Sequence, residues 1–99
     1  MGKVSDARRE LLVVIGAGGI GLAIARRLGP GRKVLIADHD DRVLGFACEQ
    51  LAIEGFEVVS AQVDVGDEGS VTALAQRAGA MGPVALLVEQ WLGSRRRSG

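Results

Sequence analysis

The feature that most constrains the fold of this chain is a continuous apolar run, Leu11–Ile15, which leads directly into the glycine-rich segment at residues 16–21. The run is short and rich in β-branched residues, which is typical of a strand buried on both faces. Strands of this kind occur in parallel sheets, because crossover helices cover both faces of such sheets. We therefore expect strands and helices to alternate along the chain.

The rest of the sequence shows this alternation. Apolar runs at Lys33–Asp38, residues 57–63 and residues 84–88 predict three further strands, and the segments between them have apolar residues at helical spacing. The residues expected to face the core are Ile20, Ala23, Ile24 and Leu28 in the first helix, Val43, Leu44, Ala47, Leu51 and Ala52 in the second, and Val71, Leu74, Ala75 and Ala78 in the third. The sequence thus predicts an α/β fold with three αβα layers and an incomplete parallel sheet of four strands in the order 3-2-1-4.

Capping residues indicate where these helices begin and end. The first helix is predicted over residues 22–28, because Gly29 follows it and is itself followed by a proline. Asp40 or Asp41 can cap the N-terminus of the second helix, and Asp67 can cap the third. The connections between elements are therefore short, as a compact α/β unit requires.

The glycine-rich segment matches the pattern G-x-G-x-x-G at Gly16, Gly18 and Gly21. The pattern alone is weak evidence, but here it follows a buried strand and opens a helix, as in Rossmann-type dinucleotide-binding domains. Gly16 would permit the tight turn, Gly18 the close approach of a pyrophosphate, and Gly21 the packing of helix against strand. The free N–H groups of the first helical turn would then hold the phosphates. The alternative is that these glycines form only a sharp turn.

Two aspartates follow predicted strands at the edge of the sheet where such domains bind their ligand. Asp38 ends the second strand, about 20 residues after the glycine motif, where a carboxylate can bind the ribose hydroxyls and repel a 2′-phosphate. NAD is therefore favoured as the cofactor over NADP, although the neighbouring Arg42 could still admit NADP. The alternative is that Asp38 only begins a turn. Asp64 follows the third strand, where it either contacts the adenine or serves only in a turn.

The sequence resembles the short-chain dehydrogenase/reductase family. The segments that carry the resemblance are residues 13–28, 35–38, 63–74 and 82–88. The resemblance implies an NAD(P)-dependent oxidoreductase with a Rossmann fold. The cofactor contacts that it implies are Gly16, Gly18, Ile20, Gly21, Asp38, Asp64 and Val65. The predicted site also includes Gly19, within the same loop, and His39, which either borders the adenine pocket or is a solvated turn residue.

The sequence also departs from the family pattern. The glycine loop is one residue shorter than is usual and lacks a threonine, and residues 89–92 do not match the usual Asn-Asn-Ala-Gly. The family's catalytic residues are a serine and a Tyr-x-x-x-Lys pair, but the chain contains no tyrosine and no lysine after Lys33. No catalytic residue is therefore assigned, and we expect the chain by itself to be inactive. The abrupt change of pattern suggests a premature stop or an altered reading frame.

These features predict three segments: a flexible leader over residues 1–10, a partial NAD(P)-binding domain over residues 11–88 and an irregular basic tail over residues 89–99. A sheet of four strands would leave the fourth strand as an open edge and one face with a single helix. Such surfaces favour self-association. We therefore expect a dinucleotide to be the main partner, with self-association through the fourth strand and the uncovered face.

Charge and composition exclude several other classes of function. The chain has 12 basic and 12 acidic residues, but Arg95, Arg96 and Arg97 lie together in the tail, so the remainder is acidic and nucleic acid is not an expected partner. No apolar run is long enough to span a bilayer. The single cysteine, Cys48, cannot form an internal disulfide, which predicts a cytoplasmic location. His39 is the only histidine, and no metal site is expected.

Two other functions remain open at this point. The chain could be a regulatory NAD-binding module, similar to the NAD-sensing domains of potassium-transport systems, which also pair a G-x-G-x-x-G loop with an acid after the second strand. It could also be a non-functional truncated product. The pattern after the third strand, Asp64-Val65 followed by Ser70-Val71, favours the dehydrogenase over the transport module.

Overall fold

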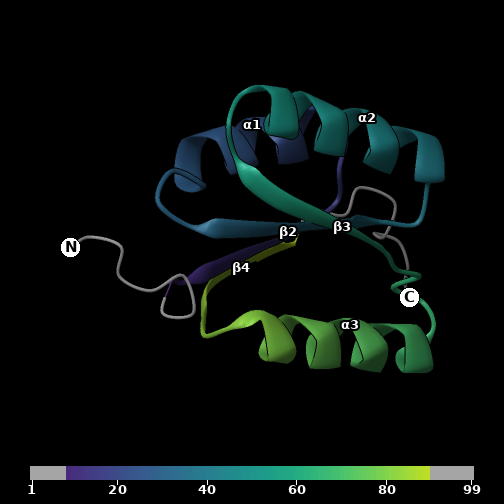
Figure 1. Ribbon diagram of the computed structural model, residues 1–99. Helices are drawn as coiled ribbons and strands as arrows, with labels where there is room; N and C mark the ends of the chain where they lie inside the picture. The colour runs from purple at the N-terminus through teal and green to yellow at the C-terminus, as the bar shows by residue number, and fades with distance from the viewer. Residues whose placement is uncertain (1–8, 90–99) are drawn as a thin grey trace.

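Strands and helices alternate along residues 9–89, the part of the chain that the computed structural model describes (Figure 1). The strands are β1 (Leu11–Ile15), β2 (Lys33–Asp38), β3 (Glu57–Gln62) and β4 (Val84–Glu89), and the helices are α1 (Gly19–Leu28), α2 (Asp41–Ile53) and α3 (Glu68–Met81). All pairings are parallel, and the four strands lie in the order β3-β2-β1-β4. The predicted α/β fold and strand order are confirmed. The expected leader and basic tail lie almost entirely outside the described residues.

The predicted boundaries of β1 and β2 are correct, and the others shift slightly. Helix α1 begins at Gly19 rather than at residue 22, because the glycine loop itself forms the first helical turn. Strand β3 ends at Gln62, one residue early, and β4 continues to Glu89, which the sequence placed in the tail. Asp40, rather than Asp41, caps α2, and Asp67 caps α3 as expected.

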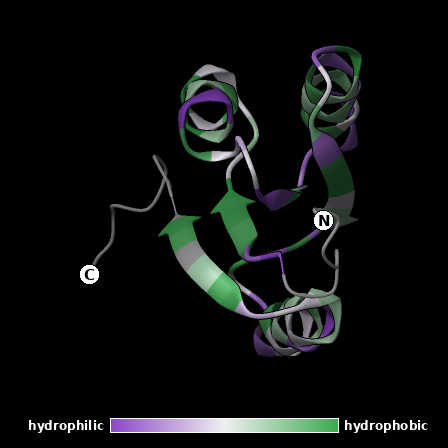
Figure 2. Ribbon diagram, turned by 60° about the vertical axis from the view of Figure 1, so that its left-hand side comes forward, coloured by the Kyte–Doolittle hydropathy of each residue, from purple (hydrophilic) through white to green (hydrophobic). Residues whose placement is uncertain are grey.

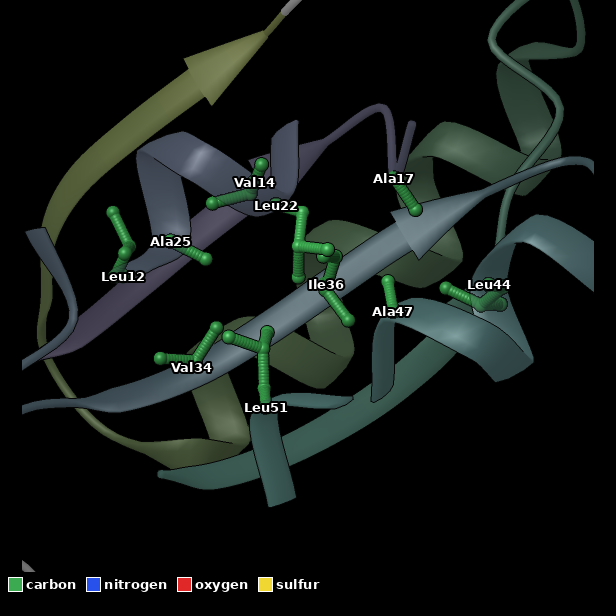
Figure 3. Close-up of a cluster of buried hydrophobic side chains, with 10 residues drawn as sticks. All are labelled: Leu12, Val14, Ala17, Leu22, Ala25, Val34, Ile36, Leu44, Ala47 and Leu51. Carbon is green, nitrogen blue, oxygen red and sulfur yellow. The ribbon is translucent and has the colours of Figure 1, made fainter. Parts of the chain in front are cut away.

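The sheet separates two cores, because successive side chains of a strand point to opposite faces. One face is covered by α1 and α2 and the other by α3 (Figure 1). The core below α1 and α2 is drawn in Figure 3, and its buried members are Leu12, Val14, Ala17, Leu22, Ala25, Val34, Ile36, Leu44, Ala47 and Leu51. The core above α3 contains Leu11, Val13, Leu35, Ala37, Ala61, Val63, Leu74 and Ala78. Strands β1 and β2 are therefore buried on both faces, as their continuous apolar sequences predict.

The predicted buried face of α1 is wrong in part. Leu22 and Ala25 face the core, whereas Ile20 is 62% exposed and Ala23 is also exposed. Gly21 lies against the backbone of Gly16, and this contact sets the rotation of the helix. Because each residue advances by about 100°, Ile20 then lies on the opposite side from Leu22.

The predicted buried faces of α2 and α3 are too wide. Ala52 in α2 and Ala75 in α3 are exposed, and Val71 is 39% exposed. Leu51 and Leu74, which precede these two alanines, are buried. A helix on a flat sheet buries a narrow stripe, so a residue about 100° from its centre remains in contact with solvent.

Strand β4 is an edge strand whose apolar side chains are poorly covered. Leu87 pairs with Val13 and therefore lies on the face of α3, but it is 61% exposed. Val84, at the start of the strand, is 47% exposed. Figure 2 shows that α3 lies below the middle of the sheet and that apolar β4 extends beyond it. The apolar edge that the sequence predicted is thus present in the described part of the chain.

Candidate functional site

The loops that follow β1, β2 and β3 meet at the carboxyl edge of the sheet, because the strands are parallel (Figure 1). The glycine loop leaves β1 there, Asp38 ends β2, and Gln62 ends β3 and pairs with Asp38 in the sheet. The N-termini of all three helices lie at the same edge, since each helix runs antiparallel to the strands. This edge therefore combines the predicted site residues with the positive ends of the helices.

Two of the loop glycines are required by the fold. Gly16 has a φ of +111°, a conformation that L side chains rarely adopt. Its N–H donates a 2.7 Å hydrogen bond to the carbonyl of Ala37, which ties the turn to β2. A Cβ on Gly21 would lie 1.8 Å from the carbonyl oxygen of Gly16. Tight turning and close packing thus account for Gly16 and Gly21.

The other two loop glycines are not required by the fold. A Cβ on Gly18 or Gly19 would meet no atom within 4 Å apart from those of adjoining residues and the backbone of α1, and both residues are exposed. Gly18 has a φ of −73°, which any residue can adopt. The absence of side chains here therefore gives open access to the backbone at the start of α1, which is the property that a close-fitting phosphate ligand needs.

The N-terminus of α1 differs from those of the other two helices. It has no side-chain cap and no acidic residue in its first turn. In α2, by contrast, the carboxylate of Asp40 accepts hydrogen bonds from the N–H groups of Arg42 and Val43, and in α3 that of Asp67 accepts one from Gly69. Within residues 9–89, the first N–H groups of α1 are therefore left without a side-chain acceptor, and an anion could accept their hydrogen bonds.

Asp38 connects the end of β2 to the glycine loop. Its Oδ2 accepts a 2.7 Å hydrogen bond from the N–H of Ala17, and its Oδ1 accepts one of 2.9 Å from the N–H of Asp40. The side chain is 14% exposed. Asp38 does begin a turn, as the alternative interpretation held, but a carboxylate has about four acceptor positions. Because Nδ1 of His39 also lies 3.3 Å from Oδ1, at most two acceptor positions remain for further donors.

Asp64 and Val65 have structural roles in the turn after β3. The Oδ1 of Asp64 accepts a 3.0 Å hydrogen bond from Gly66, and the N–H of Asp64 donates to the hydroxyl of Ser70 at 2.9 Å. Val65 packs against the core above α3. Asp64 is exposed, so its second carboxylate oxygen can face a ligand.

An open depression of about 400 Å³ lies between the ends of β2 and β3. Its lining residues are His39, Gln62, Val63, Asp64 and Ser70. The His39 side chain is 81% exposed and lies at the rim, with Nδ1 3.3 Å from Oδ1 of Asp38. The sequence did not identify Gln62 or Ser70, although the parallel pairing of Gln62 with Asp38 could have indicated the first.

Other kinds of site have less support. Within residues 9–89, no group of three or more histidine, cysteine, aspartate or glutamate side chains could hold a metal ion. In the same part of the chain, no helix is long and apolar enough to cross a membrane. Cys48 is half-buried in α2, away from the depression. The exposed glycines and the uncapped N-terminus of α1 are the described features that an anion could use.

Comparisons with known proteins agree with this geometry. Residues 10–90 match the family model of short chain dehydrogenases. A short-chain dehydrogenase/reductase of Alternaria brassicicola is 44% identical over 76 residues, which is 77% of this chain and 28% of that protein.

Solved structures give the same result. A short-chain dehydrogenase/reductase of Burkholderia phymatum in complex with NAD is 34% identical, with a TM-score of 0.73 over 85% of this chain and 31% of the other. The actinorhodin polyketide ketoreductase with NADPH is 32% identical, with a TM-score of 0.79 over 88% of this chain and 34% of the other. The chain thus spans about a third of the length of these proteins. It belongs to the short-chain dehydrogenase family and corresponds to the N-terminal, NAD(P)-binding portion of its members.

Proposed function

We propose that this chain binds the ADP portion of NAD at the carboxyl edge of its sheet, as the cofactor-binding part of an oxidoreductase. The observation that carries the proposal is the contrast within the glycine loop. Gly16 and Gly21 satisfy the fold, whereas Gly18 and Gly19 leave the backbone open at an uncapped helix N-terminus. A pyrophosphate is the anion that such a loop accommodates.

The residues present fit the other parts of the cofactor. The carboxylate of Asp38 has acceptor positions left for the adenine-ribose hydroxyls, and the depression beside it has room for a base. His39 and Asp64, which line the depression, would border the adenine, and Val65 would contact the cofactor from the turn after β3. Ile20, exposed in the first turn of α1, would contact the cofactor beyond the pyrophosphate. NAD supplies the hydride acceptor in the reactions of such enzymes.

The preference for NAD over NADP rests on charge. Asp38 carries the carboxylate that lies nearest to the proposed ribose position, and a 2′-phosphate placed there would meet like charge. Related structures contain NAD in one case and NADPH in another, so both cofactors occur within the family. We propose that this chain belongs to the NAD-binding group.

A second candidate is an inactive product that self-associates. It is favoured by the apolar edge at β4, where, among the described residues, Leu87 is 61% and Val84 is 47% exposed. Open apolar edges pair readily with other chains. Light scattering tests this candidate. It predicts that the measured mass rises with protein concentration. A mass that stays at that of the monomer at high concentration would contradict it.

Calorimetric titration of the chain with NAD, NADP and AMP tests the main proposal. We expect NAD and AMP to bind with similar affinity, because the contacts lie mainly on the ADP portion, and NADP to bind more weakly. The sequence contains no tyrosine, so we expect no dehydrogenase turnover by this chain alone. Absence of binding by both NAD and AMP would contradict the proposal, and equal binding of NADP would contradict its specificity.

A further inference from the structure

Helix α2 has an outer face that the rest of the described chain, residues 9–89, leaves exposed. The buried residues of the helix, Leu44, Ala47 and Leu51, pack into the core against the sheet. The exposed residues on the opposite side, which form the outer face of α2, are Arg42, Gly45, Phe46, Glu49, Ala52 and Ile53. Two of them are large and apolar, and Phe46 is 59% and Ile53 72% exposed.

The spacing on this face is that of a helix-packing surface. Arg42, Phe46, Glu49 and Ile53 follow one another at intervals of four, three and four residues. At about 100° per residue, all four lie within a stripe about 60° wide that is directed away from the sheet. Single exposed apolar residues are ordinary on a protein surface, whereas intervals of three and four residues are typical of a helix that packs against another helix.

The two charged side chains of the stripe have no partner of opposite charge within their own helix. Arg42 and Glu49 are seven residues apart, whereas ion pairs along a helix join residues three or four apart. The positions of α2 three and four residues from either one are uncharged. The ion pairs within residues 9–89 join other side chains. Both charges of the outer face are therefore available to a partner.

The arrangement of these charges identifies the partner as a second copy of this chain. Arg42 lies four residues before Phe46 and Glu49 three residues after it, which is about 6 Å and about 4.5 Å along the helix axis. A two-fold axis close to Phe46 that pairs α2 with α2 of a second copy, antiparallel, therefore places Arg42 of each copy beside Glu49 of the other. Gly45, exposed and without a side chain, leaves room beside the axis for the phenyl ring of the second copy.

We propose that the outer face of α2 is the interface of a two-fold symmetric dimer, in which α2 packs antiparallel against α2 of a second copy. Such an interface is closed, because each copy contributes the same face, so association stops at two chains. Helix α2 has 13 residues and is about 20 Å long. One pair of such helices is small beside the interfaces of about 1,200–2,000 Å² that stable complexes form, so the dimer requires a high protein concentration.

Reversing the charges of the outer face tests the proposal. Arg42→Glu gives each dimer two pairs of facing carboxylates, and Glu49→Arg gives it two pairs of facing guanidinium groups. We expect either variant alone to have a dissociation constant about tenfold higher than that of the native chain, measured by sedimentation equilibrium. In an equimolar mixture, each variant supplies the charge that the other lacks, so a dimer of one copy of each should form with about native affinity.

The substitutions are compatible with the helix. An acidic residue in the first turn of α2 suits the positive end of the helix, and arginine is a good helix former. Phe46→Ala removes the ring beside the axis and should raise the dissociation constant by about tenfold or more. Leu87→Ala is the matched control, because Leu87 is similarly exposed, at 61%, but lies on β4. It should leave the dimer unchanged.

The expected mass of the native chain rises with concentration toward that of two chains and no further. A native chain that stays monomeric at high concentration would overturn the proposal and leave the outer face of α2 to a different partner. Association that is weakened by Leu87→Ala but not by Arg42→Glu or Phe46→Ala would also overturn it, and would place the contact at β4. A mixture of the two charge variants that associates no more than either variant alone would do the same, because charge pairing across the two-fold axis would then be absent.

Discussion

The two edges of the sheet satisfy their polar groups in different ways. At the amino edge, where the strands begin and the helices end, side chains of opposite charge meet each other. Among the described residues, the pairs are Arg9 with Glu57, Arg26 with Glu54, and Arg32 with Glu10. At the carboxyl edge, Asp38 bonds to backbone N–H groups, and the N-terminus of α1 has no side-chain acceptor.

This difference between the edges suggests different roles: the amino edge stabilises the fold, and the carboxyl edge is available to bind a ligand. Helix C-termini attract cations, and α1 ends with Arg26 and Arg27 in its last turn. The amino edge therefore pairs most of its charged side chains within the protein, and among the described residues Nε of Arg32 is the buried side-chain atom left without a hydrogen bond. The carboxyl edge satisfies the N-termini of α2 and α3, which Asp40 and Asp67 cap, but not that of α1. Only groups that the fold leaves open can bind a ligand without first losing an internal partner.

The largest expected effect is a loss of stability when Gly21, one of the two glycines that the fold requires, is replaced. Gly21→Ala places a Cβ 1.8 Å from the carbonyl oxygen of Gly16, so the loop or α1 must move. We expect a loss of stability of roughly 3 kcal/mol or more, measured by urea denaturation. Gly79→Ala in α3 is the matched control, because its Cβ meets nothing within 4 Å, and it should stabilise the protein by about 0.5–1 kcal/mol. Equal stability of Gly21→Ala and the native chain would contradict the packing role.

A smaller effect is expected from the carboxylate that links β2 to the loop. Asp38→Ala removes the acceptor for the N–H of Ala17 and should cost about 1.5–3 kcal/mol, the range for hydrogen bonds to charged groups. It should also reduce the discrimination between AMP and 2′,5′-ADP. The control is Asp67→Ala, which removes the cap of α3 at the same edge and should cost about 1 kcal/mol.

Nucleotide binding is what distinguishes the two aspartate variants. Asp67→Ala should bind AMP and 2′,5′-ADP as the native chain does, because Asp67 is not among the residues that line the depression. If both variants changed the ratio of the AMP and 2′,5′-ADP affinities equally, the cause would be the loss of one negative charge at the carboxyl edge, whichever aspartate carried it. The specific role of Asp38 would then be lost.

A still smaller effect, on affinity rather than stability, is expected when Gly18, one of the two glycines that the fold does not require, is replaced. Gly18→Ala adds a methyl group in open space at an allowed φ of −73°. We expect little change in stability but a loss of NAD affinity of about tenfold, or ~1.4 kcal/mol, because the methyl group would separate the pyrophosphate from the N–H groups of α1. A variant that bound NAD as tightly as the native chain would break the contrast between the two kinds of glycine.

The fold could be predicted further than the site, for reasons that particular residues show. Continuous apolar runs mark β1 and β2 because both of their faces are buried, so no polar residue interrupts them. The start of α1 was missed because glycine is a poor helix former, yet Gly19 lies in the first turn, where the loop geometry decides.

The site depends on contacts between distant parts of the sequence. Asp38 was found from its spacing to the glycine motif, but its bond to Ala17 follows from the pairing of β1 with β2. Gln62 and Ser70 were missed because a polar residue at the end of a strand resembles any turn residue. Their common depression exists only once β2, β3 and α3 are in place.

The smallest expected effect lies at the amino edge. Arg26 donates two hydrogen bonds to Glu54, of 2.9 Å and 2.6 Å, and the side chains are 44% and 34% exposed. The hydrogen bond from Arg26 lowers the pKa of Glu54 below its usual value. Arg26→Ala should therefore lower the melting temperature only slightly at neutral pH, as exposed pairs generally do.

The difference in melting temperature between Arg26→Ala and the native chain should depend on pH, because the pKa of Glu54 is lowered in the folded protein. Because the pKa of Glu54 is lower in the folded protein than in the unfolded chain, the pair stabilises the fold fully above the unfolded pKa. The contribution is lost as the pH falls through the folded pKa, so the melting temperatures of Arg26→Ala and the native chain should converge as the pH falls below the unfolded value of about 4.5. A difference that persisted at low pH would assign the effect to packing of the arginine stem. NAD affinity should be unchanged in this variant, since the pair lies at the edge opposite the site, and a change would show that the two edges are coupled.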